Sequence, residues 1–111
     1  MSGTHDTEAA FEVLAGDRAR VEGSLDFGTV AHLLRKGSIA IGAGRAAVID
    51  LVGVTGSDSS GLALLIEWLS VAQQAGRALR YENMPALLMQ LARLSEVEAL
   101  LTAGTASPAP T

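Results

Sequence analysis

The stretch Ala46-Ala-Val-Ile-Asp-Leu-Val52 is followed closely by Thr55-Gly-Ser-Asp-Ser-Ser-Gly-Leu-Ala-Leu-Leu65. The first stretch is an apolar run typical of a strand covered on both faces, so it predicts a central strand that is parallel to a neighbour. The second places hydroxyl and carboxylate side chains directly before a helix predicted over 59–75, which Gly76 ends. A short strand over 78–81 then completes a right-handed strand-helix-strand unit.

The residues before this unit predict a β-hairpin and a first helix. Short alternating strands flank Gly16-Asp17, a pair that accepts the positive φ of a tight turn. Asp26 can cap a helix of about ten residues that runs to Arg35-Lys36, and Gly37 can act as its left-handed stop. Residues 38–45 are then expected to form a glycine-rich connector.

The residues after the unit predict two short helices. Asn83 and Pro85 suit the start of a helix over 84–94. The sequence Ser95-Glu-Val-Glu98 is a capping box that can start a last helix. We therefore predict an α/β fold with one mixed four-stranded sheet, helices packed on it, and the element order ββαβαβαα.

Length and composition fit one domain. The 111 residues suffice for one core, expected over 9–101 with disordered ends at 1–8 and 102–111. Eight Lys+Arg against twelve Asp+Glu give a net charge of −4, which argues against a nucleic-acid partner. The chain has no cysteine, so disulfides and thiol chemistry are excluded. Neither a secretory signal nor a membrane-length apolar run is visible, and we expect a cytoplasmic chain without direct membrane insertion.

Two catalytic interpretations of the polar turn lack required residues. A nucleophile elbow at Ser57-Asp-Ser-Ser-Gly61 would expose Ser59, but no histidine follows that serine to act as its base. Gly53 and Gly56 have neither the spacing nor the lysine of a phosphate-binding loop. We therefore expect no catalytic residue, no metal site and no cofactor. A purely structural role stays open, because Asp58 is a good N-cap.

The helix after the turn is apolar over more than half of its circumference. One stripe should face the sheet: Leu62, Leu65, Ile66, Leu69 and Ala72. A second stripe lies on another side: Leu64, Trp68, Val71 and Ala75. Either flanking helices cover the second stripe or it is a docking surface. Leu33 raises the same question, because a core stripe can be made in the first helix without it, from Phe27, Val30, Ala31 and Leu34.

The two quoted motifs also carry a family resemblance. At Ile49-Asp-Leu-Val-Gly-Val54 and Ser57-Asp-Ser-Ser-Gly-Leu-Ala-Leu-Leu65, with the spacing onward to Gly76 and Leu94, the chain resembles a STAS domain. This is the fold of anti-sigma-factor antagonists and of sulfate-transporter tails. Within the family, the chain is most similar to the small STAS subunits of bacterial Mla phospholipid-transport ABC complexes. The resemblance implies a protein-binding module without enzymatic activity.

The resemblance leaves two uses of the turn open. In the transport branch, the residue matching Ser59 contacts the cytoplasmic ATPase, which implies a subunit peripheral to the inner membrane that reaches the permease and substrate-binding subunits through that ATPase. Such a complex helps maintain outer-membrane lipid asymmetry. In the antagonist branch, a partner kinase phosphorylates the serine matching Ser60. The expected partner-binding residues are Asp58, Ser59, Ser60, Leu33 and Leu64, and the candidate phosphorylation sites are Ser60 and Ser59.

Overall fold

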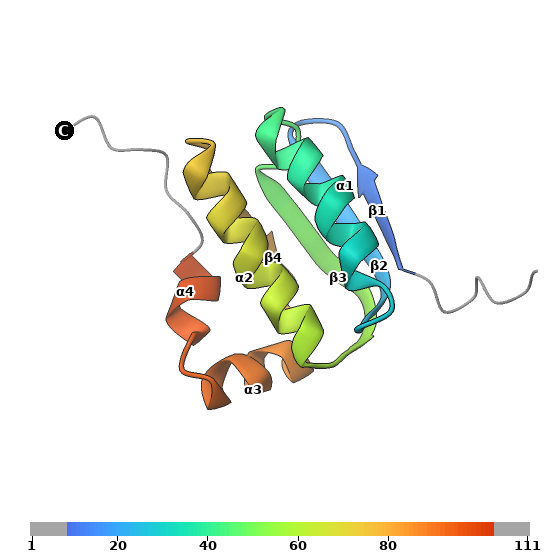
Figure 1. Cartoon of the computed structure of the whole chain (residues 1–111), viewed down its shortest axis with the longest axis vertical. Helices are drawn as coiled ribbons and strands as arrows, with labels where there is room; N and C mark the ends of the chain where they lie inside the picture. The colour runs from blue at the N-terminus through green and yellow to red at the C-terminus, as the bar shows by residue number, and fades with distance from the viewer. Residues whose placement is uncertain (1–8, 104–111) are drawn as a thin grey trace, which may run out of the picture.

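The computed structural model describes residues 9–103, which build one four-stranded sheet and four helices (Figure 1). The elements follow one another in the order ββαβαβαα, which confirms the predicted α/β fold. Their bounds are β1 Ala10–Val13, β2 Arg18–Leu25, α1 Val30–Gly42, β3 Val48–Ser57, α2 Ser59–Gln74, β4 Arg80–Glu82, α3 Ala86–Leu94 and α4 Glu98–Ala103.

The strand β3 lies inside the sheet and organises it. The sheet order is β1-β2-β3-β4; β2 and β4 both run parallel to β3, while β1 pairs antiparallel with β2. This arrangement confirms the predicted central parallel strand. Ile49 and Leu51 point from β3 toward the helices and are fully buried. The strand continues past the predicted end at Val52 to Ser57, because β2 stays paired with it as far as Leu25.

The predicted hairpin is also confirmed. The strands β1 and β2 are antiparallel, with Phe11 opposite Val21. The turn between them contains Gly16 at φ 74° and Asp17 at φ 63°. Two successive positive φ values match the twist of the flanking strands, which is why glycine and aspartate suit this turn.

The first helix begins later than predicted. The Asp26 carboxylate accepts a hydrogen bond from the Gly28 N–H at 2.9 Å within the preceding loop, and the N-cap of α1 is Thr29. The Thr29 hydroxyl donates to the Ser24 carbonyl at 2.8 Å. The loop is thus closed by its own hydrogen bonds, and it leaves Phe27 with 85% of its surface exposed.

The first helix also continues beyond its predicted end. It passes through Gly37 to Gly42, so the first part of the predicted connector over 38–45 is helical. A Cβ atom at Gly37 would lie 2.4 Å from the indole of Trp68 on α2. Gly37 is therefore needed for close helix packing instead of helix termination. The left-handed residue after the helix is Gly44, at φ 77°.

The face that α1 turns to the core differs from the predicted one. The buried residues of the helix are Leu33, Gly37, Ala40 and Ile41. In the predicted core stripe, Ala31 is exposed and Val30 and Leu34 are only partly buried. The requirement that Gly37 face α2 sets this rotation, because residues three and four positions apart share one helix face.

The helix α2 begins and ends as predicted. The Asp58 carboxylate accepts a hydrogen bond from the Ser60 N–H at 2.7 Å, which confirms Asp58 as the N-cap. Ala75 is the C-cap, and Gly76 follows in the left-handed conformation at φ 69°. The short strand after it, predicted over 78–81, is β4.

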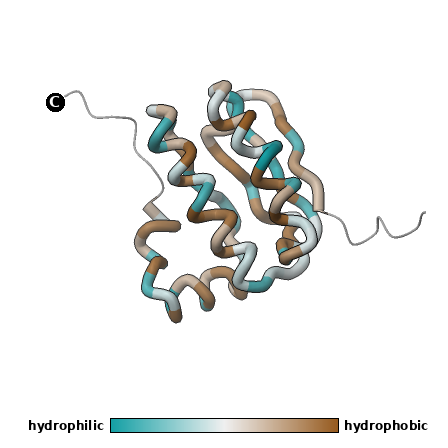
Figure 2. The backbone as a smooth tube through the Cα atoms, in the orientation of Figure 1, coloured by the Kyte–Doolittle hydropathy of each residue, from teal (hydrophilic) through white to brown (hydrophobic). Residues whose placement is uncertain are grey.

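Both apolar stripes of α2 contribute to the core. Leu65 and Leu69 are buried, and so are Leu64 and Trp68 of the second stripe. The helices α1 and α2 lie side by side over one face of the sheet, with hydrophobic residues recurring along both (Figures 1 and 2). The Trp68 ring also makes an edge contact with Phe11, at 5.5 Å between centroids. The second stripe is therefore covered at Leu64 and Trp68 by the neighbouring helix α1, as the first of the two alternatives predicted.

The other face of the sheet carries charged side chains, which corrects the prediction that β3 is covered on both faces. Arg20 and Glu12 link β2 to β1 at 2.8 Å, and Arg18 reaches across β3 to Glu82 on β4. Val52 is 65% exposed on β3. Ion pairs this exposed contribute little to stability, but they keep this face polar.

The C-terminal helices lie beside α2, and α4 contacts β4 (Figure 1). The helix α3 has Pro85 as its N-cap and Ser95 as its C-cap. The predicted capping box is therefore wrong, because Ser95 ends one helix before α4 starts. Glu96 takes a positive φ of 61° in the intervening turn. Glu98 accepts a hydrogen bond from Arg93 at 3.0 Å.

The domain end differs slightly from the predicted one. Residues 102 and 103 belong to α4 instead of a disordered tail. The expected disorder of 1–8 and of the remaining tail, 104–111, falls outside the described residues.

The contact between Gly37 and Trp68 gives a stability prediction. Gly37→Ala should lower the free energy of unfolding by about 1–3 kcal/mol relative to Gly42→Ala, because the added methyl overlaps the indole. Gly42 is the matched control: it lies in the same helix, and a Cβ atom there meets nothing within 4 Å. Urea unfolding followed by circular dichroism measures both variants. Equal stabilities would contradict the packing role of Gly37.

Candidate partner-binding site

The polar turn between β3 and α2 is fastened to the end of β2. The Asp58 N–H donates to the Leu25 carbonyl at 3.0 Å. The Ser57 hydroxyl donates to the Asp58 carbonyl at 2.9 Å, and the Asp58 carboxylate caps the helix. These bonds hold the turn in one conformation. Ser59 stays exposed at its surface, and Ser60 is partly buried.

A glycine makes this close attachment possible. A Cβ atom at Gly61 would lie 2.1 Å from the Ser57 hydroxyl and 2.8 Å from the Leu25 Cβ. Any larger residue would therefore push the first turn of α2 away from β2. The spacing of Ser57, Asp58 and Gly61 thus has a structural reason, independent of what the exposed serine does.

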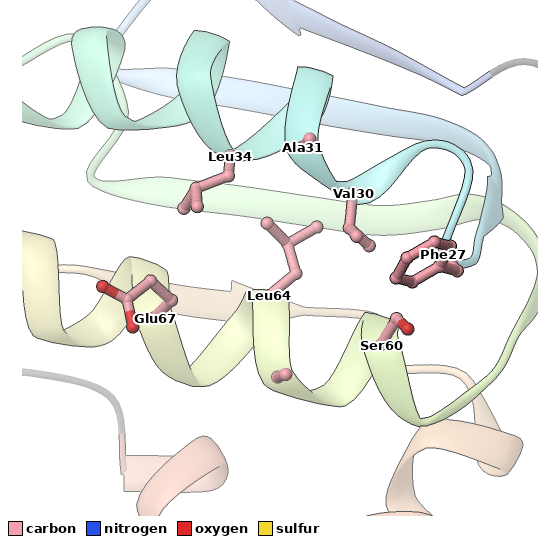
Figure 3. Close-up of a pocket in the computed structure, with 8 residues that line it drawn as sticks. Phe27, Val30, Ala31, Leu34, Ser60, Leu64 and Glu67 are labelled. Carbon is pink, nitrogen blue, oxygen red and sulfur yellow. The ribbon is translucent and has the colours of Figure 1, made fainter.

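An apolar groove begins next to the turn, between α1 and α2 (Figure 3). Its volume is about 600 Å³. Its lining residues are Phe27, Val30, Ala31, Leu34, Ser60, Ala63, Leu64 and Glu67. Ser60 and Phe27 lie at one end of the groove and Glu67 at the other. The groove is therefore apolar along its length and polar only toward its ends.

The structure brings four of the five expected partner-binding residues together. Asp58, Ser59 and Ser60 form the turn, and Leu64 points from α2 into the space between the two helices (Figure 3). Leu64 is only 3% exposed, so a partner would reach it from within the groove. Leu33 is the exception: contrary to the prediction it is fully buried in the core and offers no surface to a partner.

The sequence interpretation missed Phe27, which it assigned to the core stripe of the first helix. Phe27 lies in the loop before α1 and forms one end of the groove. The signal that could have found it is the flanking sequence Asp26-Phe-Gly-Thr29. Aspartate and threonine at such positions form local side-chain turns, which place the intervening residues outside the helix.

Residues 9–103 contain neither a metal-binding cluster nor a membrane-spanning helix. Within that range, no group of three or more histidine, cysteine, aspartate or glutamate side chains is placed to hold a metal ion. No helix there combines the length and apolar character that a membrane crossing requires. The site is thus a capped helix start with one exposed hydroxyl, that of Ser59, beside an apolar groove, an arrangement typical of surfaces that contact another protein.

Comparisons with known proteins agree on the fold. A family model described as "Mlab, STAS domain" matches residues 13–102. No curated protein sequence matches the chain significantly. Among solved structures, the unphosphorylated anti-sigma factor antagonist SpoIIAA superposes with a TM-score of 0.60 at 19% identity, covering 78% of this chain and 82% of that one.

Two more structures are similar. The Bacillus cell fate determinant SpoIIAA in its phosphorylated form has a TM-score of 0.60 at 20% identity, over 81% of this chain and 86% of that one. A protein named Mglu has a TM-score of 0.55 at 24% identity, over 69% of this chain but only 20% of its own length. At these identities the structures establish the shared fold, whereas the family model covers most of the sequence. The chain belongs to the STAS domain family.

Proposed function

We propose that this chain is a non-catalytic STAS subunit that binds and supports the cytoplasmic ATPase of an ABC complex for phospholipid transport between membranes. Through the ATPase it would associate with the permease and substrate-binding subunits, peripheral to the inner membrane, and serve outer-membrane lipid asymmetry. The matching family model, described by the name Mlab, supports this branch of the family. The observation that carries the proposal is the exposed Ser59 beside the apolar groove between α1 and α2.

The groove offers a partner both apolar contact and a defined polar edge. Phe27 is 85% exposed, and burying a side chain of this size contributes roughly 1.5–3 kcal/mol. Aromatic residues that fill or flank a pocket are typical centres of binding energy in protein interfaces. The Asp58-Ser59 turn next to it would fix the orientation of the partner through hydrogen bonds.

The charge at the groove ends favours a cationic group on the partner. Glu67 is exposed at one end and makes no ion pair with any described residue. Asp58 is exposed near the other end. A lysine or arginine of the ATPase placed at either end would therefore gain a charged contact, and an acidic side chain would be repelled.

A second candidate function is an anti-sigma-factor antagonist switched by serine phosphorylation. The similarity to SpoIIAA in both phosphorylation states favours it. Ser60 lies in the first turn of α2, where the helix dipole stabilises negative charge. A phosphate there would add about −1.5 to −2 charge at the end of an apolar groove. The fold would tolerate such a modification, while a partner that covers the groove would be released.

Substitution of Ser59 tests the docking site. Ser59→Arg should weaken binding to the ATPase by at least about tenfold, because a long charged side chain at the centre of the contact must be desolvated or displaced. Gln74→Arg, on an exposed position of the last turn of the same helix, is the control for added charge. Binding is measured by co-purification and by titration with the isolated ATPase. Unchanged affinity of a folded Ser59→Arg chain would rule out this site.

Removal of the aromatic ring at the groove gives an independent prediction. Phe27→Ala should reduce ATPase affinity by about ten- to a hundredfold, since an anchor worth roughly 1.5–3 kcal/mol is lost. The free energy of unfolding should change little, because Phe27 is mostly exposed in the isolated chain. Leu94→Ala is the matched control, as Leu94 is 82% exposed on α3. Equal affinities of the two variants would mean that the groove is not the contact.

Affinity purification from the native host separates the two candidate functions. Under mild detergent, the tagged chain should retain an ABC ATPase and its permease, and its mass should show no phosphate. The antagonist function predicts instead a soluble serine kinase and one phosphate that maps to Ser60 and disappears in Ser60→Ala. Recovery of the kinase without transporter subunits would replace the transport proposal.

A further inference from the structure

The two edges of the sheet are protected differently. At one edge, α4 contacts the short strand β4. At the other edge lies β1, which pairs with β2 on its inner side and is the outermost strand in Figure 1. No described element pairs with its outer side. Unpaired backbone N–H and carbonyl groups along an edge strand are able to pair with another extended chain.

A second groove runs along this open edge, between β1 and the C-terminal half of α1. Its volume is about 630 Å³. The residues that line it include Phe11, Glu12, Val13, Lys36, Ile39 and Arg45. Ile39 is 69% exposed and Val13 42% exposed, so two large apolar side chains face water beside the unpaired strand. This groove lies across α1 from the one that contains Phe27.

The charged side chains that line this groove are mostly cationic. Lys36 and Arg45 make no ion pair with any described residue. The acidic residue of β1, Glu12, is held by Arg20 at 2.8 Å on the other face of the sheet. Side chains alternate between faces along a strand, so Phe11 and Val13 share the helix side. The helix side of the edge is therefore apolar and cationic.

We propose that β1 accepts an extended, acidic segment of a partner protein as an additional strand. The added backbone pairs with the outer groups of β1. Alternate side chains on its helix side pack against Val13 and Ile39, and an aspartate or glutamate lies close to Lys36 and Arg45. In strand addition, backbone hydrogen bonds give the affinity and alternate side chains give the specificity. Here the open edge of β1 offers the backbone groups, and the groove offers the contacts for alternate side chains.

The charge pattern distinguishes this occupant from a second copy of the same chain. A second copy paired through its own β1 would bring another Lys36 and Arg45 to the same groove region. On the helix side, β1 offers only Phe11 and Val13 and no carboxylate to neutralise them. A helical partner would leave the edge backbone unpaired. An extended acidic segment satisfies the backbone, the apolar side chains and the cations together.

Selection from a random peptide library displayed on phage, against the immobilised full chain, tests the proposal. Enriched peptides should alternate apolar and other residues and contain aspartate or glutamate. When such a peptide is added, the NMR amide signals of residues 10–13 should shift. Its affinity should fall about tenfold or more for Ile39→Glu and for the pair Lys36→Glu with Arg45→Glu.

The controls are matched in charge and exposure. Arg35→Glu changes the same charge on the same helix outside the groove, and Leu94→Glu places a charge on another exposed leucine. Both should bind the peptide as the unmodified chain does, and so should Ser59→Arg, because ATPase docking involves the other groove. All substituted positions are exposed, and thermal unfolding verifies that each variant folds.

Three results would overturn the inference. The first is a selection that enriches no peptide. The second is a set of peptides whose affinity does not change with Ile39→Glu, or that shift the NMR amide signals of Ser60 and Leu64 instead of those of β1. The third is concentration-dependent dimerisation that Ile39→Glu abolishes, which would assign the edge to a second copy. None of these results bears on binding of the ATPase at Ser59.

Discussion

The indole of Trp68 lies against the backbone of Gly37, and this contact sets the distance and rotation of α1 relative to α2. Trp68 has no exposed surface and also contacts Phe11 from β1, so it joins both helices to the sheet. With Gly37 turned toward α2, Leu33 must face the core and Ala31 must face outward. The groove between the helices is a consequence of this rotation, because it leaves Leu34 only partly covered.

The second constraint is that the helices cover only one face of the sheet. Ion pairs occupy the other face, where charged side chains on β1, β2 and β4 satisfy one another. Apolar surface is consequently exposed at the seams of the helical layer: between α1 and α2, and between α1 and the edge strand β1. A partner bound in either groove would contact residues of two elements at once. Its binding would therefore depend on how α1 packs against α2 and β1.

Much of this arrangement could be predicted from local sequence rules. The hairpin turn, the central strand, the Asp58 cap and the order of elements each depend on a few adjacent residues. The errors at Gly37 and Leu33 have one cause: a glycine at the end of an amphipathic pattern suits a helix stop as well as a close contact between helices. The error at Phe27 has a local cause, because the hydrogen bonds of Asp26 and Thr29 hold it in the loop before α1. Choosing between a helix stop and a helix contact at Gly37 requires knowing that Trp68, which is distant in sequence, lies opposite Gly37 in the fold. The family resemblance predicted the turn as a candidate site, whereas the groove that includes Phe27 depends on that tertiary contact.

The same hydrogen bonds that make the turn rigid also make its serine available. Asp58 satisfies the Ser60 N–H, and the Leu25 carbonyl satisfies the Asp58 N–H, so the helix start is capped without any contribution from the Ser59 side chain. A hydroxyl that the fold does not need can be used for a partner or for modification at little cost in stability. In the proposed function, stability and recognition would therefore depend on adjacent residues: Asp58 caps the helix, and Ser59 is free to contact a partner without a cost to that cap.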